Sequence, residues 1–259
     1  MTFRQAGNIL ANTVPFCAAL LIGLFVSAMG RAAHAHDPGF DQAPAYFDLY
    51  TASIPPYTAP APGGRIKGTL VPVVYEFLEE RGIRFRASML PWSAAYRRAE
   101  TNPHALIFPL DRTAVREDKF HWILPLETTH YYLYGLRGRA KPDTSLEDIV
   151  RDGDKVSCTR NSIQCELLLK NGLPDANILR IEGASIPDRR NLIIRQRNLY
   201  SVFDPVVYER LTTQNGIDGS RLIKLMKVGD MTSYLAANKG FPAAALSSLQ
   251  TAPSQPADN

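Results

Sequence analysis

Cys158 and Cys165 are placed where their side chains could react with each other. They flank a predicted strand-to-helix turn, and in an oxidising compartment two cysteines at this spacing could close a small disulfide. The alternative is a pair of free, buried thiols, because a bond also needs the right distance between the two backbones. Spacing alone leaves both interpretations open. The third cysteine, Cys17, falls in an apolar segment near the N-terminus.

The histidines form no recognisable metal-binding pattern. No HExxH motif, no pair at ligand spacing and no cysteine cluster occurs in the sequence, so we expect no structural metal. The sequence also contains no GxGxxG after a strand, no Walker motif and no GxSxG elbow. It therefore gives no support for nucleotide chemistry or serine hydrolysis, and we expect no cofactor. The five histidines are His34, His36, His104, His121 and His130.

The N-terminus has the pattern of a secretory signal peptide. Arg4 precedes a long apolar run at residues 14–29, and small residues follow in the sequence that ends at Ala35. We predict that residues 1–35 are cleaved on export. A membrane-anchoring helix is the alternative, but glycines and a proline interrupt the run, and it is shorter than the roughly 20 residues that a span needs.

Composition and charge exclude several classes of protein. The chain is 45% apolar and 21% charged, which is ordinary globular composition and excludes a disordered or multi-pass membrane protein. The formal net charge of +4 includes two arginines in the predicted signal peptide. No stripe of basic residues with interleaved aromatics marks a nucleic-acid groove, so we expect no nucleic-acid partner.

The elements that would position functional side chains alternate between strands and helices. In the first half, Leu70 begins a helix with one apolar face that ends at Gly82, and Ser93 is a plausible N-cap of the next helix. Such alternation predicts the α/β class, with a mostly parallel sheet and helices on its faces. The predicted strands of this half are 47–53, 84–89 and 105–109, and its second helix is 94–100.

A second alternating series follows, and two strand-like stretches bracket it. These stretches, 131–136 and 234–237, could carry the chain between two lobes, which predicts a hinge near Leu136 and Ala236. A last helix is predicted at 242–249. The series itself consists of helices at 145–150, 162–170, 187–194 and 206–211 and strands at 155–158, 178–181 and 199–203.

The order of these features resembles that of the type II periplasmic solute-binding proteins, in particular the amino-acid-binding (family 3) components of ABC transporters. The resemblance covers residues 47–239. It is carried by the sequence YTASIPPY at 50–57 with Gly68 after it, by Pro91-Trp92 before a helix, and by RTAVRE at 112–117. It implies a two-lobed α/β fold, with a mixed, mostly parallel sheet and flanking helices in each lobe. Lobe 1 would be 44–132 plus 239–252, and lobe 2 would be 133–238.

The resemblance assigns Thr113 and Arg116 to the carboxylate of a ligand. The physical chemistry agrees, because a guanidinium is a rigid planar fork that matches a carboxylate with two hydrogen bonds. The alternative is an arginine on a solvated helical face, paired with Glu117 or Asp118.

In the second lobe, the resemblance assigns Asp204 to the ammonium group of the ligand. Because Pro205 follows at a plausible first helical position, Asp204 is also a candidate N-cap, and both roles are compatible. Arg160 and Ser162 fall in the second ligand-contacting turn, although helix capping alone would explain a serine there.

Tyr57 and Trp92 are candidate aromatic walls of the site, since binding pockets are mostly apolar with a few polar anchors. Ordinary core packing is the alternative for each ring. Three features depart from the family pattern: Leu199 replaces an acidic residue, Phe203 replaces a small residue before Asp204, and residues 69–71 lack the acidic residue that often follows the glycine at position 68. The ligand could therefore differ from a standard amino acid.

Three functions follow from this interpretation. The first is a monomeric periplasmic protein that captures a small polar, carboxylate-bearing and amino-acid-like solute for a membrane permease or sensor. The second is an interaction module that keeps the fold without binding a small ligand. The third is a periplasmic enzyme on the same fold, for which Glu117 and Asp204 are the acid-base candidates, although nothing in their spacing singles them out.

Overall fold

The structure is a computed structural model that describes residues 46–182, 186–195, 200–214 and 218–251. All of them belong to one compact unit. The predicted signal peptide, Cys17 and Leu199 lie outside the described residues. None of the described helices is both long and apolar enough to cross a membrane.

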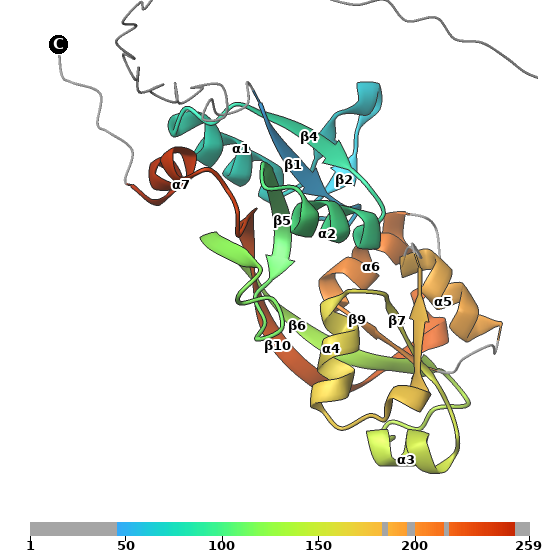
Figure 1. Ribbon diagram of the computed structural model, residues 1–259. Coiled ribbons are helices and arrows are strands. Elements are labelled where there is room, and N and C mark those ends of the chain that lie inside the picture. The colour runs from blue at the N-terminus through green and yellow to red at the C-terminus, as the bar shows by residue number, and fades with distance from the viewer. Residues whose placement is uncertain (1–45, 183–185, 196–199, 215–217, 252–259) are drawn as a thin grey trace, which may run out of the picture. The chain divides into compact units, whose positions relative to one another are not determined.

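One eight-stranded sheet forms the centre of the fold (Figure 1), in the order β4-β1-β5-β10-β6-β9-β7-β8. The three strands at each end are parallel to one another, and the two middle strands pair antiparallel with their neighbours. The strands are β1 (Phe47–Thr51), β4 (Phe85–Met89), β5 (Ala105–Asp111), β6 (Phe120–Leu136), β7 (Val156–Thr159), β8 (Ile178–Ile181), β9 (Tyr200–Phe203) and β10 (Leu222–Asn238). Two short strands, β2 (Ala59–Pro60) and β3 (Ile66–Lys67), form a separate pair.

Helices alternate with the strands in both halves, so the predicted α/β class is confirmed. They are α1 (Leu70–Glu80), α2 (Trp92–Thr101), α3 (Leu146–Arg151), α4 (Ile163–Lys170), α5 (Ile186–Ile194), α6 (Pro205–Gln214) and α7 (Ala243–Gln250), with short 3-10 turns at Pro62–Gly64, Asp175–Asn177 and Gly219–Arg221. One cap differs from the prediction. Pro91, not Ser93, is the N-cap of α2, because the helix begins at Trp92 and takes Ser93 into its buried face.

Among the described residues, four clusters of buried side chains, two in each half, give the fold its two lobes. In lobe 1, α1 and α7 pack on β1 and β5, around residues such as Leu49 and Leu78. In lobe 2, α3 and α4 pack on β7 and β9, around residues such as Val156 and Leu168. The two lobes share one continuous sheet instead of having a sheet each, because β6 and β10 run through both.

Strands β6 and β10 are much longer than the sequence pattern predicted. Each has 17 residues, and they pair with each other from the pair Phe120–Asn238 to the pair Leu136–Leu222. Figure 1 shows them side by side, leading from the part that carries α1 and α2 to the part that carries α3 and α4. The middle of β6 is hard to recognise as a strand, since Pro125 lies in it and exposed polar side chains follow.

The crossing between the lobes lies in the middle of these strands. In β6, Leu126 still packs against the lobe 1 core, whereas Tyr131 belongs to the lobe 2 core. In β10, Met231 still packs against the lobe 2 core, whereas Leu235 belongs to the lobe 1 core. In β6 the crossing lies earlier in the chain than predicted, because Leu136 packs inside lobe 2, beyond Tyr131. In β10 the predicted residue Ala236 directly follows Leu235, at the lobe 1 side of the crossing.

Candidate functional site

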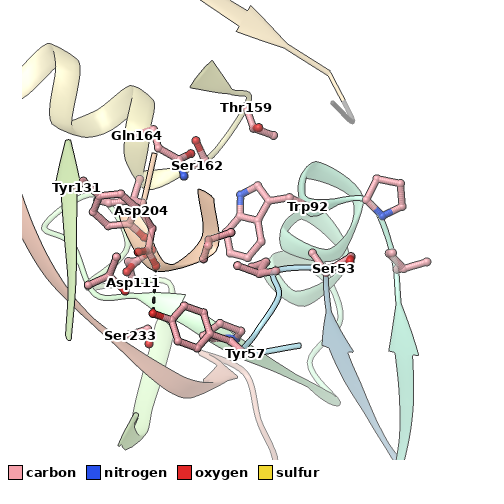
Figure 2. Close-up of a pocket in the computed structure, with 18 of the residues that line it drawn as sticks. Ser53, Tyr57, Trp92, Asp111, Tyr131, Thr159, Ser162, Gln164, Asp204 and Ser233 are labelled. Carbon is pink, nitrogen blue, oxygen red and sulfur yellow. Dashed lines mark hydrogen bonds between the residues drawn. The ribbon is translucent and has the colours of Figure 1, made fainter. Parts of the chain in front are cut away.

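A cavity of about 390 Å³ lies between the two lobes (Figure 2). It is at the carboxyl ends of β1, β5, β7 and β9, where ligands bind in open α/β sheets. Its volume falls within the range of small-molecule sites. Lobe 1 contributes Ala52, Ser53, Ile54, Tyr57, Met89, Leu90, Pro91, Trp92, Pro109 and Asp111; lobe 2 contributes Thr159, Ser162, Ile163, Gln164, Asp204 and Val207; and the crossing strands contribute Thr129, Tyr131 and Ser233.

Asp204 caps α6 and also lines the cavity, while its contact with a ligand ammonium group stays a prediction. Its Oδ1 accepts a hydrogen bond from the Val206 amide at 2.8 Å, as a cap of α6, and the residue also lines the cavity. Its Oδ2 accepts a hydrogen bond from the Tyr57 hydroxyl at 3.1 Å, drawn as a dashed line in Figure 2. Burial raises the pKa of Asp204, and these two donors oppose that effect.

Asp111 is a second carboxylate in the cavity, and the sequence reasoning missed it. It ends β5 and is 8% exposed. Its Oδ2 accepts a hydrogen bond from the Tyr131 hydroxyl at 3.3 Å, whereas its Oδ1 has no hydrogen-bond partner among the described residues. Burial raises the pKa of Asp111 to about 6, although the positive charge of Arg116 lowers it. The sequence signal that could have identified Asp111 is an acidic residue directly after the fully buried run that begins at Ala105.

Aromatic rings form part of the cavity lining, and two of them are the residues that the sequence nominated. Tyr57 and Trp92 line it from lobe 1, and Tyr131, which was not predicted, lines it from β6. The indole Nε1 of Trp92 donates a hydrogen bond to the Asn161 carbonyl of lobe 2 at 2.9 Å. Both predicted rings therefore also make a polar contact to the other lobe.

The loop that carries Tyr57 is fixed by the start of α1. The amides of Thr69 and Leu70 donate to the carbonyls of Pro56 and Tyr57 at 3.0 and 3.2 Å. This approach requires glycine at position 68, where φ is +142° and a Cβ atom would lie 2.1 Å from the Tyr57 carbonyl oxygen. The close approach of these two backbone segments therefore explains why the motif has glycine at position 68.

Arg116 and Thr113 do not line the cavity, although both are buried. Arg116 is 1% exposed and lies at the boundary between the lobes. Its Nη1 donates to the Asp111 carbonyl at 2.9 Å, and its Nη2 lies 3.1 Å from the Asn161 carbonyl and 2.6 Å from Glu166 Oε1. The alternative of a solvated arginine is therefore wrong, whereas binding of a ligand carboxylate by Arg116 and Thr113 stays a prediction.

The turn after β7 brings one of its two predicted residues into the cavity. Ser162 lines the cavity and is the N-cap of α4, with no side-chain capping bond. Arg160 is exposed and pairs with Glu182 at 2.8 Å, outside the lining. A disulfide joins Cys158 to Cys165, with the two Cα atoms 5.4 Å apart, and so ties the end of β7 to the first turn of α4.

The remaining candidates lie apart from the cavity. Glu117, considered as an acid-base group, forms a surface pair with Arg112, whose Nε donates to it at 2.9 Å. Within the described ranges, no three histidine, cysteine, aspartate or glutamate side chains come together as a metal site. The polar groups that face one another in the cavity are therefore the two carboxylates with the hydroxyl and amide side chains around them.

The fold is that of two-lobed periplasmic binding proteins. No protein-family model and no curated protein sequence matches the chain. A histidine kinase sensor domain with similarity to periplasmic binding proteins is 17% identical, with a TM-score of 0.67 over 80% of this chain and 87% of that chain. EhuB in complex with hydroxyectoine is 17% identical, with a TM-score of 0.66 over 79% of this chain and 80% of that chain. A Gly52Ala mutant of the arginine-bound ArgBP from T. maritima is 14% identical, with a TM-score of 0.64 over 79% and 92% of the two chains.

Proposed function

We propose that this protein is a periplasmic solute-binding protein, which captures one small polar solute between its lobes and presents the closed form to a membrane transporter or sensor. The observation that carries this proposal is the cavity between the lobes, because each lobe lines it with one buried carboxylate and with hydroxyl groups, and aromatic rings complete the lining. The structural neighbours are binding proteins and a sensor domain with the same fold.

Direct contacts between the lobes support a mechanism of closure. Tyr57 donates to Asp204, and Trp92 and Arg116 both donate to the Asn161 carbonyl. A solute that touches both lobes would bind the closed form more tightly than the open form, and this difference in affinity is what shifts such an equilibrium. The crossing strands β6 and β10 would bend to allow this movement.

An amino-acid-like solute is the candidate that the sequence suggests. Its ammonium group would bind Asp204, which lines the cavity. Its carboxylate would bind Arg116 and Thr113, and for this the Arg116 guanidinium would have to exchange its contact with Glu166 for the ligand. The structure therefore supports the predicted ammonium contact better than the predicted carboxylate contact, because only the ammonium partner lines the cavity.

A ligand screen by thermal unfolding tests the proposal. The purified protein is melted with amino acids, amines, small carboxylates and sugar acids, and each hit is then titrated by calorimetry. A ligand at 100 times its Kd adds about 2.7 kcal/mol to the free energy of unfolding, which corresponds to roughly 5 to 10 °C in Tm. We expect one solute class to bind with 1:1 stoichiometry and without conversion.

Two aspartate variants, one in the cavity and one on the surface, provide a test and its matched control. Asp204→Asn should weaken binding of the solute about tenfold or more, because a hydrogen bond to a charged group is lost from the site. Asp118→Asn, on the exposed surface, should leave the affinity unchanged. A cooperative melt with no ligand hit would contradict the proposal and favour an interaction module, and turnover of a hit would favour an enzyme.

A further inference from the structure

The cavity has an uneven balance of charge. Asp111 and Asp204 both line it, and Figure 2 shows them on the same side of the space, across from Trp92. Among the lining residues that the structure describes, there is no lysine, arginine or histidine. Apart from the Trp92 indole, which donates to Asn161, the other polar side chains of the lining are hydroxyls and one amide, from Ser53, Tyr57, Thr129, Tyr131, Thr159, Ser162, Gln164 and Ser233.

The nearest cation does not neutralise this pair of carboxylates. Arg116 approaches Asp111, but its charge is shared with Glu166, which lies 2.6 Å from Nη2. Glu127 adds a further negative charge that acts on Asp204. Two carboxylates in one cavity wall, with the local arginine already paired, produce a negative potential in a partly desolvated space.

One oxygen in this wall has no partner. Asp111 is more than nine-tenths buried, and its Oδ1 accepts no hydrogen bond from any described residue. A buried charged oxygen without a donor is costly, and native proteins rarely retain one without a reason. A cationic N–H donor from a ligand would satisfy this oxygen and offset the repulsion between the two carboxylates.

The aromatic rings fit the same class of ligand. Tyr57, Trp92 and Tyr131 line the cavity together with the two carboxylates. The faces of such rings attract organic cations, most strongly when the cation is shielded from water. A ligand carboxylate, in contrast, would enter a wall that already carries two negative charges.

From this arrangement we propose that the solute is an organic cation without a carboxylate of its own, an amine whose charged nitrogen lies between Asp111 and Asp204 and whose body packs against the aromatic rings. The inference rests on the proposed solute-binding function and specifies the class of solute. It makes Asp111 a residue that determines specificity, since this second carboxylate is what disfavours a ligand with an acidic end.

Matched pairs of amines and amino acids test the inference. Each amine is compared with the amino acid from which it differs by loss of the carboxylate: agmatine with arginine, cadaverine with lysine, putrescine with ornithine, and histamine with histidine. We expect at least one amine to bind about tenfold or more tightly than its parent amino acid, because like charges in a partly desolvated site are strongly disfavoured. The same calorimetric titrations then compare Asp111→Asn with Asp118→Asn.

Asp111→Asn should weaken binding of the amine about tenfold or more, and it should narrow the difference in affinity between the amine and its parent amino acid. Asp118→Asn should change neither quantity. A thermal melt of each variant shows that it is folded. Asp204→Asn removes the other carboxylate of the same cavity wall and should also weaken binding of the amine. If an amino acid binds as tightly as its amine, or if only an uncharged or acidic solute binds, the inference is overturned while the solute-binding function stands. If no compound of the pairs or the screen binds a cooperatively melting protein, the proposed function fails as well.

Discussion

Arg116 Nη2 lies 2.6 Å from Glu166 Oε1, which places a charge pair across the boundary between the lobes. Arg116 follows β5 in lobe 1, and Glu166 is on α4 in lobe 2. The same guanidinium donates to the Asn161 carbonyl, and the Tyr96 ring lies 5.3 Å from it. Arg116 therefore links the lobes through contacts that a shorter or uncharged side chain would not make.

Replacing Arg116 should destabilise the protein strongly. Arg116→Met leaves Glu166 without its ion-pair partner and removes one donor each from the Asp111 and Asn161 carbonyls, and loss of one partner of a buried pair costs roughly 3 to 5 kcal/mol. The control is Arg160→Met, which breaks the exposed pair with Glu182 and should cost less than about 1 kcal/mol. Urea unfolding measures both variants, and equal midpoints for the two would contradict this role of Arg116.

Tyr57→Phe should favour the open form without loss of the aromatic ring. The variant removes only the hydroxyl that donates to Asp204, a change of about 1 kcal/mol or roughly fivefold in the ratio of closed to open protein. The emission of Trp92 reports the change in a Trp122→Phe background, because the chain has two tryptophans. Loss of the bond from Trp92 to Asn161 and greater contact with water should shift the emission to the red.

The matched control for this experiment is Tyr75→Phe, on α1 and packed against the lobe 1 core. It should leave the emission unchanged. A spectrum of Tyr57→Phe that is identical to that of the control would mean that the bond between Tyr57 and Asp204 does not contribute to closure.

The stability of the protein should depend on pH through Asp111. Its pKa is raised to about 6 by burial, with Arg116 opposing and Glu166 and Asp204 reinforcing the shift, and Tyr131 also donates to it. The folded form then binds more protons than the unfolded form between about pH 4 and pH 6, so the free energy of unfolding falls as pH rises through this range. At about 1.4 kcal/mol per pKa unit, the contribution reaches roughly 3 kcal/mol.

Asp111→Asn removes this dependence. We expect the variant without ligand to be more stable than the wild type at pH 7 and to lose that advantage near pH 4, as measured by urea unfolding at several pH values. Parallel curves for the two proteins would contradict the assignment. Amine binding to the wild type should weaken below about pH 6, because a proton then competes for the same carboxylate.

The disulfide should stabilise the turn that carries Ser162. Replacing Cys158 and Cys165 by alanine removes a cross-link that closes a short loop, which is worth about 2 to 3 kcal/mol. The solute affinity should also fall, since Thr159 and Ser162 of this turn line the cavity. Reduced wild-type protein should behave like the double variant, and unchanged stability and affinity after verified reduction would refute the prediction.

Local patterns in the sequence were sufficient to predict most elements. The apolar face that begins at Leu70 and the turn at Gly82 identified α1, and the short apolar run at Ile178–Ile181 identified β8 with its observed bounds. These signals are local, because a helix face or a buried strand is determined by neighbouring side chains. The central part of β6 lacks such a signal, since its side chains face partly into solvent between the two cores.

The site depends on contacts between distant residues, which no local pattern encodes. Tyr57, Trp92, Ser162 and Asp204 could be nominated from motif resemblance, and the structure brings them to one cavity. The position of Arg116 could not be predicted, because its partner Glu166 belongs to the other lobe. Asp111 was missed for a similar reason, since the predicted strand stopped at 109 and the facing wall from lobe 2 was unknown.

The position of β10 in the sheet also determines when the protein can finish folding. Strand β10 lies between β5 and β6, yet it is the last strand in the chain. Until Leu222–Asn238 is available, β5 has an unpaired edge, although all the other strands of lobe 1 are already complete. Pairing over so long a stretch of sequence is slow because a large loop must close first. Lobe 1, which begins the described chain, is therefore expected to be completed only after lobe 2 has been synthesised.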